Sequence, residues 1–325
     1  MANIKEIAIL AGVSVTTVSR VLNEHPYVSD AKRKAVLDVV AKLNYTPNYN
    51  AVYLSKGKTL TIGVLVPFLN HPYFSAITQG IANGALQHNY RIVTCQTNYE
   101  AREEMKALQL LQTRQVDGFI ICSKTMEWEE IAPFTLYAPI IACEDTTNDS
   151  IPCVHINQYL GFTLGMEHLI ERGHCHIGYC IARQTSFNSK QRKRAYDDAL
   201  TKINERIHEE WIFDGCLEIQ DGVRVVREWM LLKDRPTALL VSSDQVAAGI
   251  VIEARKNGIG IPEDLAVIGF DNHPISEIMG ITTIEHPSLA LGESAFQLLF
   301  NQINGNCLQK NNIELALRLI KRNTT

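Results

Sequence analysis

The chain has 325 residues, of which 46% are hydrophobic, so it can build one large or two to three modest domains with real cores. Its net charge of -4 is unevenly spread: residues 1–58 carry eight Lys and Arg against four acidic residues, and the remainder is acidic. A basic head and an acidic body indicate that only the head meets a phosphate backbone. No apolar run has the ~18 residues of a membrane span and no N-terminal run resembles a secretory signal, so we expect a cytoplasmic protein without a membrane partner.

Residues 4–23 (IKEIAILAGVSVTTVSRVLN) have the pattern of two short helices separated by a glycine. Ile4, Ile7, Ala8 and Ala11 fall on one apolar face of the first helix, and Asn3 precedes it as a cap. After Gly12, Ser14 can cap a second segment, whose apolar face is formed by Val18, Val21 and Leu22. Two short helices joined by a glycine turn predict a helix-turn-helix.

The second helix of such a motif enters the major groove of DNA, where its early, outward residues contact the bases. Arg20 is the strongest candidate for base discrimination, because a guanidinium can bond guanine O6 and N7 together, worth about 1 to 3 kcal/mol. Val15 can touch a thymine methyl group. The predicted DNA-binding residues in the head are Ser14, Val15, Thr16, Thr17, Ser19, Arg20, Asn23 and Ser29.

A third helix starts at Ser29 or Asp30, and its apolar stripe runs from Ala35 to Leu43. Pro47 disfavours helix at Thr46 and ends this element. The following segment, Asn48 to Ser55, has the length of one or two helical turns, which is too short for a stable isolated helix in water. The sequence therefore predicts a closed three-helix head followed by a short connecting segment.

IKEIAILAGVSVTTVSRVLN, then VSDAKRKAVLDVVAKLNYTPN and AVYL, resemble the N-terminus of the LacI/GalR family of bacterial transcription regulators, and the resemblance continues along the chain. It implies a helix-turn-helix domain at 1–47, a hinge helix and linker at 48–58, and an effector-binding and dimerisation core at 59–325. It also assigns DNA contacts to Asn48, Ala51 and Leu54, with Leu54 as a wedge in the minor groove. Val52 departs from the family, in which an arginine often follows the hinge alanine.

From residue 60 onward, short apolar runs of strand length alternate with helical periodicity. TIGVLVP (61–67), GFIIC (118–122), PIIAC (139–143), TALLVS (237–242) and LAVIGF (265–270) are the clearest of these runs. Near-continuous apolar strands between helices indicate parallel sheets covered on both faces. The residues support an α/β class with two such units. The resemblance adds the two-lobed, doubly wound, periplasmic-binding-protein-like (type I) architecture, with lobe 1 at about 59–157 and 288–311 and lobe 2 at about 158–287 and 312–325.

Ligands of doubly wound sheets bind outside the carboxyl ends of the strands. Matched residue by residue, the resemblance places effector contacts at Tyr73, Phe74, Glu144, Arg192, Leu217, Ser243, Asp271 and His286. A guanidinium can bond two vicinal hydroxyls, a carboxylate can accept from a third, and an aromatic ring can stack on the apolar face of a sugar. Two alternatives remain open: Asp271 can simply cap the turn before Pro274, and Phe74 can belong to the helix core.

Several positions of this expected cleft depart from the family pattern, so the resemblance says least about which effector binds. Asn157-Gln158 stands where many relatives have Asp-Asn, Leu217 replaces a frequent aromatic residue, and His286 replaces a frequent glutamine. NHPYF, QHNY, QTNYE and IIACEDT are similar to regulators of Gram-positive maltose or maltodextrin operons. This similarity makes maltose-type sugars the expected effectors.

Other classes of protein fit the sequence less well. It has no G-x-S-x-G, no H-E-x-x-H and no G-x-G-x-x-G after a strand, so we expect no enzyme and no cofactor. His174-Cys175-His176 with Cys180 suggests a metal site, but it lies at a helix-strand turn, and we predict no metal. The eight cysteines lack any C-x-x-C pair and are expected to be free thiols. A secreted receptor of the same fold would need a signal peptide and no helix-turn-helix.

We therefore expect a homodimer that binds a palindromic, double-stranded operator through two heads related by a two-fold axis. A small sugar or oligosaccharide in the cleft would shift the relative orientation of the lobes and so change operator affinity. We therefore expect a repressor of a carbohydrate-utilisation operon. The alternative is a catabolite-control regulator that answers to a phosphocarrier protein as co-regulator.

Overall fold

The computed structural model describes residues 3–23, 25–45, 57–146, 148–306 and 312–325. The chain forms two compact units, Met1–Thr59 and Leu60–Thr325, and each is described here by itself. The expected hinge contacts Asn48, Ala51 and Leu54 lie outside the described residues.

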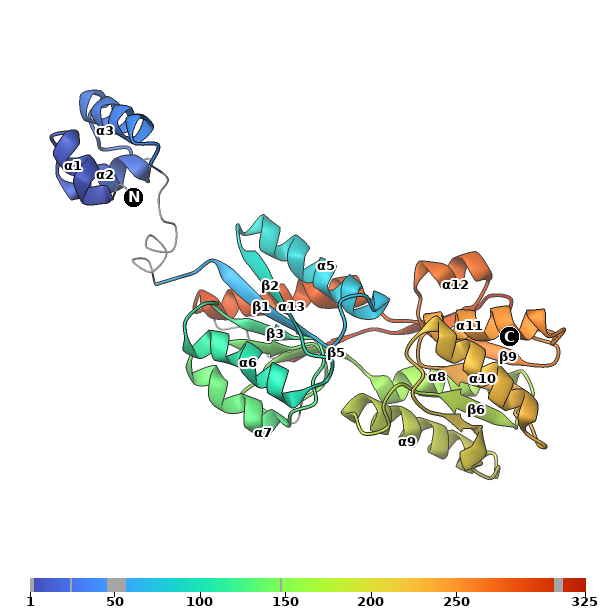
Figure 1. Cartoon of the computed structure of the whole chain (residues 1–325). Coiled ribbons are helices and arrows are strands. Elements are labelled where there is room, and N and C mark those ends of the chain that lie inside the picture. The colour runs from blue at the N-terminus through green and yellow to red at the C-terminus, as the bar shows by residue number, and fades with distance from the viewer. Residues whose placement is uncertain (1–2, 24, 46–56, 147, 307–311) are drawn as a thin grey trace. The chain divides into compact units, whose positions relative to one another are not determined.

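The described residues of the N-terminal unit form helices α1 (Ile4–Leu10), α2 (Val15–Leu22) and α3 (Asp30–Lys42), as the sequence predicts (Figure 1). The Asn3 side chain accepts hydrogen bonds from the first backbone amides of α1, and the Ser14 hydroxyl accepts one from Thr17 N at the start of α2. These caps satisfy amides that have no partner inside their helices. A small core fixes the three helices together; its buried members are Ile7, Ala8, Val18, Val21 and Val36.

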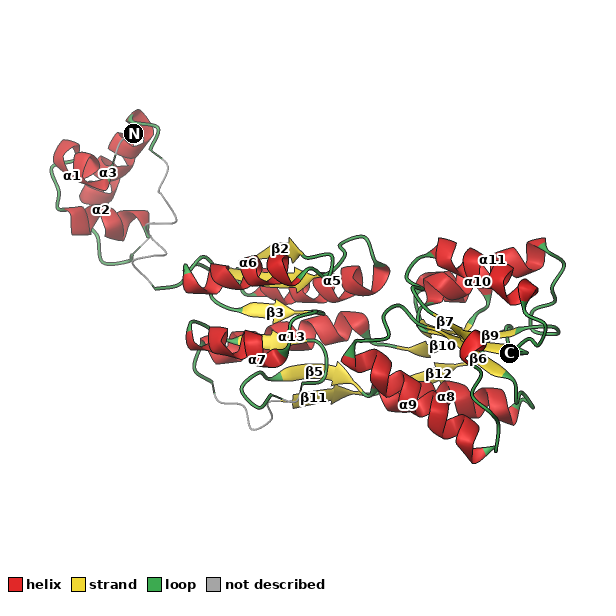
Figure 2. Cartoon of the chain, turned by 60° about the horizontal axis from the view of Figure 1, so that its bottom comes forward, coloured by secondary structure: helices red, strands yellow, loops and turns green. Residues whose placement is uncertain are grey.

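The second unit has two lobes, each built on a six-stranded sheet (Figure 2). The first sheet is parallel throughout and has the order β11-β5-β4-β3-β1-β2. Its strands are β1 (Thr61–Val66), β2 (Arg91–Gln96), β3 (Phe119–Ile121), β4 (Ile140–Ala142), β5 (Cys153–Ile156) and β11 (Asn312–Leu315). The accompanying helices are α5 (Pro72–Gln87), α6 (Ala101–Gln112), α7 (Trp128–Ile131), the 3-10 helix η1 (Ala132–Leu136) and α13 (Ser288–Ile303).

The second sheet has the order β12-β10-β9-β8-β6-β7. Its strands are β6 (Ile177–Cys180), β7 (Ile212–Phe213), β8 (Ala238–Val241), β9 (Ala266–Asp271), β10 (Thr282–Glu285) and the antiparallel β12 (Arg318–Ile320). Its helices are α8 (Gln158–Glu171), α9 (Phe187–Lys202), η2 (Glu209–Trp211), α10 (Ile219–Leu231), α11 (Asp244–Lys256) and α12 (Pro274–Met279). The predicted pair of doubly wound α/β units is therefore confirmed.

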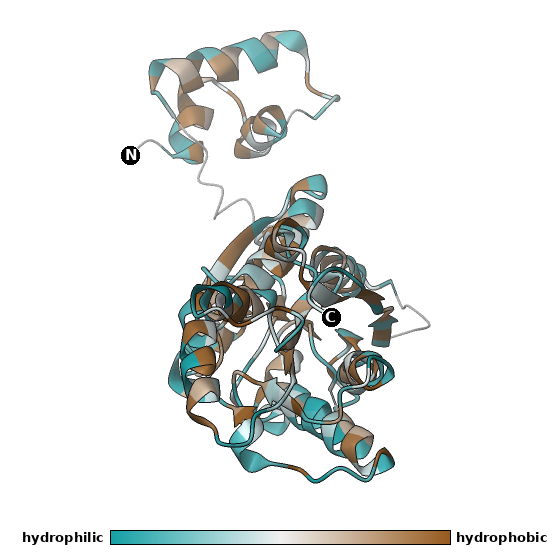
Figure 3. Ribbon diagram, turned by 90° about the vertical axis from the view of Figure 1, so that its right-hand side faces the viewer, coloured by the Kyte–Doolittle hydropathy of each residue, from teal (hydrophilic) through white to brown (hydrophobic). Residues whose placement is uncertain are grey.

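Each sheet is covered on both faces because successive strand residues point to opposite sides. In β1, Ile62 and Val64 pack in the cluster that contains α5 and α13, whereas Leu65 packs with α6 and α7. The second sheet is divided in the same way between α8 with α9 and α10 with α11. Figure 3 shows hydrophobic and hydrophilic segments alternating along the helices of both units, as expected for helices with one buried face. Among the described residues, no helix combines the length and the apolar character needed to cross a membrane.

The chain passes between the lobes at three places: Asn157, the segment 286–287, and the segment 316–317. The last crossing corrects an expectation, because we assigned 312–325 wholly to lobe 2. Strand β11 instead pairs with β5 in the first sheet, and only β12 joins the second. Both are edge strands of one extended segment, and Leu315 packs against the cores of both lobes. Periodicity gives the strand character of such a segment but not the sheet it joins.

Two pairs of helices approach each other closely through glycines. A Cβ on Gly80 of α5 would lie 2.1 Å from the carbonyl oxygen of Leu289 in α13, and one on Gly292 would lie 2.1 Å from that of Ile77. In the second lobe, Gly222 of α10 and Gly249 of α11 are equally close to the backbone of the partner helix. Each lobe therefore has one helix crossing that only glycine fits.

Candidate functional site

The outer face of α2 carries the predicted DNA-contacting side chains. Val18 and Val21 face the core of the head, whereas Val15, Thr16 and Arg20 are exposed and Ser19 is half-buried. The Ser14 hydroxyl lies 2.9 Å from that of Thr17 and also accepts from Thr17 N, so both hydroxyls are engaged in capping the helix. The structure therefore presents Val15, Thr16 and Arg20 as the most accessible part of the predicted contact set.

The remaining predicted contacts of the head lie beyond the end of α2. Asn23 is exposed and its side-chain amide donates to the Ser19 carbonyl over 2.8 Å. Ser29 is exposed at the start of α3, without a side-chain capping bond. Between them, Tyr27 is 83% exposed, a large aromatic residue that the sequence analysis did not single out. Its position in a loop beside His25 and Pro26, with no apolar periodicity around it, was the available signal.

A cavity of about 110 Å³ lies at the carboxyl ends of both sheets, between the lobes. This location agrees with the rule for ligands of doubly wound sheets. Seven of the eight predicted effector-contacting residues line it: Tyr73, Phe74, Glu144, Arg192, Leu217, Ser243 and Asp271. The first three come from the first lobe and the other four from the second, so an occupant would contact both.

Arg192 is held in the cavity by the second lobe. Its Nε donates to Gln158 Oε1 over 2.8 Å, and its guanidinium lies 4.4 Å from the centre of the Phe270 ring. Gln158 stands at one of the positions where the sequence departs from the family, and here it serves to orient the arginine. The second nitrogen, Nη1, is 3.4 Å from the Ser242 carbonyl, a long bond that leaves guanidinium N–H groups for a ligand.

Asp271 lies at the end of β9 and is held in an unusual backbone conformation, with φ of 108°. Its side chain is only 14% exposed, and burial raises its pKa to about 7, although His71 and Arg192 favour the charged form. Asp271 does not cap the following helix, because the N-cap of α12 is His273. The capping alternative is therefore wrong. The backbone of Asp271 is strained, and its poorly solvated carboxyl group faces the cavity.

The first-lobe wall combines aromatic rings with a second carboxyl group. Tyr73 and Phe74 pack edge to face with ring centres 5.0 Å apart. Phe74 is also a member of the lobe core, so the core alternative and the cavity prediction both describe it. Glu144 is buried, and burial raises its pKa to about 7 against the opposing effect of Lys124 and Arg183.

The three remaining predicted residues differ in their access to the cavity. Leu217 lines it after β7, and Ser243 lines it while its hydroxyl accepts from Gln245 N at the start of α11. His286 does not line it: this buried ring packs at a tilt against Tyr73, with centres 4.8 Å apart, and its Nδ1 is 3.7 Å from Asp271 Oδ1. Burial and Arg192 lower the pKa of His286 to about 3, so the ring is neutral and supports Tyr73 from behind.

Arg183 is a cavity residue that the sequence analysis missed. Its guanidinium carbon lies 3.6 Å from the centre of the Tyr99 ring, and its Nη1 and Nη2 donate to Thr125 Oγ1 and the Lys124 carbonyl over 3.0 and 3.1 Å. Arg183 belongs to the second lobe and its partners to the first, so these contacts join the two. The signal was available, because Arg183 follows β6 by three residues and lies at the carboxyl end of that strand.

The arrangement suits a neutral, hydroxyl-rich molecule. Arginine N–H groups supply donors, two poorly solvated carboxyl groups supply acceptors, and Tyr73 supplies a flat apolar face. The histidine and cysteine residues of the 174–176 segment do not converge in the same way. His174 Nδ1 lies 2.9 Å from Thr237 Oγ1, and the His176 ring packs against Trp211 instead.

Comparisons with known proteins cover both units. The family described as "Bacterial regulatory proteins, lacI family" matches residues 3–48, and "Periplasmic binding proteins and sugar binding domain of LacI family" matches 59–323. The NTD biosynthesis operon regulator NtdR of Bacillus subtilis (strain 168) is 43% identical over all of both chains. Catabolite control protein B of the same organism is 40% identical, covering 92% of this chain and 94% of its own. The structure of the lac repressor dimer bound to operator and the anti-inducer ONPF matches with a TM-score of 0.86 and 26% identity, covering 99% of this chain and 98% of that one.

Proposed function

Because the chain belongs to the LacI family of bacterial regulatory proteins, we propose that it represses a carbohydrate-utilisation operon and that a small sugar controls its operator affinity. Family membership makes it a DNA-binding transcription regulator and not an enzyme. The observation that carries the sugar proposal is the cavity in which Arg192 and Asp271 of one lobe face Tyr73 and Glu144 of the other. A ligand held from both sides can favour one arrangement of the lobes over another.

The mechanism begins with a dimer whose two heads contact the half-sites of a palindromic operator. In each head, α2 lies in a major groove, with Val15, Thr16 and Arg20 toward the bases. Asn48, Ala51 and Leu54 are assigned to the minor groove by the family resemblance alone. The sugar changes the relative orientation of the lobes and thereby the geometry of the segment that precedes them. The resulting coupling free energy between sugar binding and operator binding is typically about 1 to 3 kcal/mol.

The effector is a neutral sugar or oligosaccharide rather than a sugar phosphate. Two arginines line the cavity, but Arg183 already donates to Thr125 Oγ1 and the Lys124 carbonyl, which leaves Arg192 as the main cationic donor. Two carboxyl groups line it as well, and a phosphate would be repelled by those groups once ionised. Maltose and maltodextrins remain the first candidates, on the motifs NHPYF and IIACEDT. The names of the relatives NtdR and catabolite control protein B do not point to maltose, so the ligand panel should extend to other neutral sugars.

The second candidate function is catabolite control through a protein partner. It is favoured by the 40% identity with catabolite control protein B. In that case a phosphorylated carrier protein, and no sugar, would set operator affinity.

One titration separates the two candidates. The operator is first identified by selecting, from a pool of palindromic promoter fragments, those that bind the full-length protein. Sugars and a phosphorylated carrier protein are then tested for their effect on operator affinity by fluorescence anisotropy. We expect at least one neutral sugar to change that affinity about fivefold or more. A change caused by the carrier protein alone, with no sugar binding in calorimetry, would replace the sugar proposal by the second candidate.

Replacing Arg20 by alanine is expected to relax base preference at one operator position. Loss of a bidentate contact removes about 1 to 3 kcal/mol of discrimination there, because alanine has no hydrogen-bond donor for the base. The measurement is a competition assay with operators that carry each base in turn at each position. Lys34→Ala, at an exposed position of α3, controls for the loss of positive charge. A uniform loss of affinity for every operator after Arg20→Ala would reassign Arg20 to phosphate contact.

A further inference from the structure

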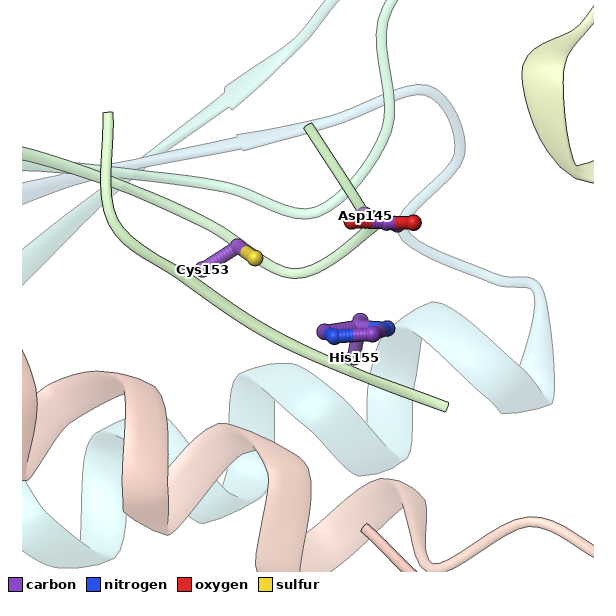
Figure 4. A group of neighbouring side chains, drawn as sticks. All are labelled: Asp145, Cys153 and His155. Atoms are coloured by element: carbon purple, nitrogen blue, oxygen red, sulfur yellow. The ribbon is translucent and has the colours of Figure 1, made fainter. Parts of the chain in front are cut away.

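Three potential metal ligands converge beside the cavity described above. The carboxylate of Asp145, the thiol of Cys153 and the imidazole of His155 place ligand atoms within 4.8 Å of one another (Figure 4). Cys153 and His155 are two residues apart on β5 and so point to the same face of the sheet. Asp145 follows the neighbouring strand β4, whose residue Ala142 is the register partner of Cys153. Sheet geometry, rather than sequence proximity alone, brings the three groups together.

The three potential ligands differ in their exposure to solvent. Cys153 is fully buried, whereas Asp145 and His155 are half-buried and line a cavity of about 360 Å³. His155 Nδ1 lies 3.4 Å from the Ile156 carbonyl, and the backbone of Thr146 hydrogen-bonds the Cys153 sulfur. The Asp145 carboxylate thus retains its acceptor capacity toward the cavity. The three polar groups therefore lie close together beside a cavity that solvent can enter.

We propose that Asp145, Cys153 and His155 bind a divalent transition-metal ion of the zinc class. One sulfur, one imidazole nitrogen and one carboxylate oxygen form a mixed donor set that suits borderline ions such as Zn²⁺ and Co²⁺, and does not suit Mg²⁺ or Ca²⁺. The fourth position would face the cavity and take water. Glu314 is a second candidate for it, because it lines the same cavity and its Cα is the register partner of that of His155.

Binding requires modest changes in the triad. Zn–S and Zn–N distances of about 2.3 and 2.0 Å require ligand atoms about 3.5 Å apart, so the side chains must close by roughly 1 Å. The ion displaces the Cys153 thiol proton to solvent and forms the sulfur–metal bond, with no change in oxidation state. Burial raises the pKa of that thiol to about 11, so metal binding competes with a proton. The half-buried carboxylate and imidazole offer the first contacts to an entering ion.

The proposed site adjoins the effector cavity without being part of it. Gln158 and Asn188 line both cavities, and Asp145 directly follows Glu144 of the effector cavity. Arg194 lines the outer part of the metal-side cavity, where it lies 3.8 Å from Asp198 in an exposed ion pair. The metal proposal goes beyond the sugar proposal and does not depend on it.

The test uses full-length protein without a histidine tag, stripped of metal with a chelator and titrated with Co²⁺ under reducing, oxygen-free conditions. We expect one ion per chain and a thiolate-to-cobalt charge-transfer absorption, which Zn²⁺ abolishes by displacement. Cys153→Ser should remove the charge-transfer band. Asp145→Asn and His155→Gln should retain the sulfur ligand but weaken Zn²⁺ binding by at least the roughly ten- to hundredfold that loss of an outer-shell partner costs, measured in competition with a chelating dye.

The matched control is Cys175→Ser, which removes an exposed thiol located between His174 and His176. Retention of the cobalt band in this variant supports the triad, whereas its loss there would assign the ion to the 174–176 segment and overturn the proposal. A wild-type protein that gives no band at saturating Co²⁺ would also overturn it. Asp145→Asn changes a half-buried residue, so it keeps the proposal testable if the buried Cys153→Ser variant fails to fold.

Discussion

Asp271→Asn is expected to abolish the response of operator binding to sugar while leaving operator affinity without sugar unchanged. The side chain is nearly isosteric, but the amide replaces a carboxyl oxygen that faces the effector cavity with a group that donates hydrogen bonds. Loss of a hydrogen bond to a charged group, together with an unpaired buried polar group, should weaken sugar binding by roughly 2 to 4 kcal/mol, or about 30- to 1,000-fold. Calorimetry gives the affinity, and fluorescence anisotropy gives the operator response.

The same variant should alter how stability depends on pH. Burial raises the pKa of Asp271 in the folded protein to about 7, compared with about 3.9 for an unfolded aspartate. Between these values the folded state binds more protons than the unfolded state, so this carboxyl group lowers the free energy of unfolding as pH rises. Asp271→Asn removes that loss and should be more stable than wild type at pH 8, relative to pH 5, by roughly 2 to 3 kcal/mol. Asp244, whose pKa is raised to about 7 by burial and by Asp271, retains a weaker dependence.

Urea unfolding of the full chain at the two pH values measures the effect. Asp234→Asn is the matched control, because Asp234 is exposed and precedes the amino end of β8, whereas the cavity lies at the carboxyl ends of the strands. A normal sugar response in Asp271→Asn would place the effector elsewhere. An unchanged pH dependence would mean that the carboxyl group is better solvated than its burial implies.

Gly80→Ala is expected to destabilise the core, against the prediction from helix propensity. Alanine in a helix is favoured over glycine by about 1 kcal/mol. The added methyl group, however, would lie 2.1 Å from the Leu289 carbonyl oxygen and 2.9 Å from Glu293 N, atoms that belong to the backbone of α13. The helices must separate, and overpacking of this kind costs about 1 to 3 kcal/mol or more. We expect a net loss of roughly 2 kcal/mol, measured by urea unfolding of the full chain.

Gln87→Ala, at an exposed position of the same helix, is the control and should change stability by less than about 0.5 kcal/mol. A second test of the same geometry is Gly249→Ala in α11, whose Cβ would lie 2.1 Å from the Ile219 carbonyl oxygen. An increase in stability for either glycine variant would show that the helices can move apart at little cost.

Local pattern was sufficient for most secondary structure. Asn3 and Ser14 cap α1 and α2 as expected, and the strands predicted at 61–67, 118–122 and 265–270 appear within a few residues of their expected ends. Both signals are local, because capping depends on the next three residues and buried strands require apolar runs. The pattern missed β10, because a short strand with two threonines carries no such run. The resemblance placed β11 in lobe 2, whereas this half-exposed edge strand pairs with β5 of the first sheet.

Seven of the cavity residues could be predicted from the sequence, because they follow strands or match family positions. Parallel strands bring their carboxyl ends to one edge of the sheet, where ligands bind. His286 follows the same logic yet lies behind Tyr73, because the direction of a side chain at a strand end depends on its neighbours in space. The bridge from Arg183 to Tyr99 joins residues of different lobes. Neither contact follows from spacing along the chain.

The sequence by itself determined the class of protein, the capped helices of the head, the alternating strands and helices, and the donors and acceptors available at the strand ends. The class follows from motifs that resemble a known family, and the helices, strands and strand-end residues follow from patterns a few positions long. The tertiary structure decided which sheet receives β11, which glycines lie at helix crossings, and how Asp145 meets Cys153 and His155. Those features depend on the pairing of distant segments, and hydrophobic burial, which drives that pairing, specifies that a residue is inside without specifying its neighbour.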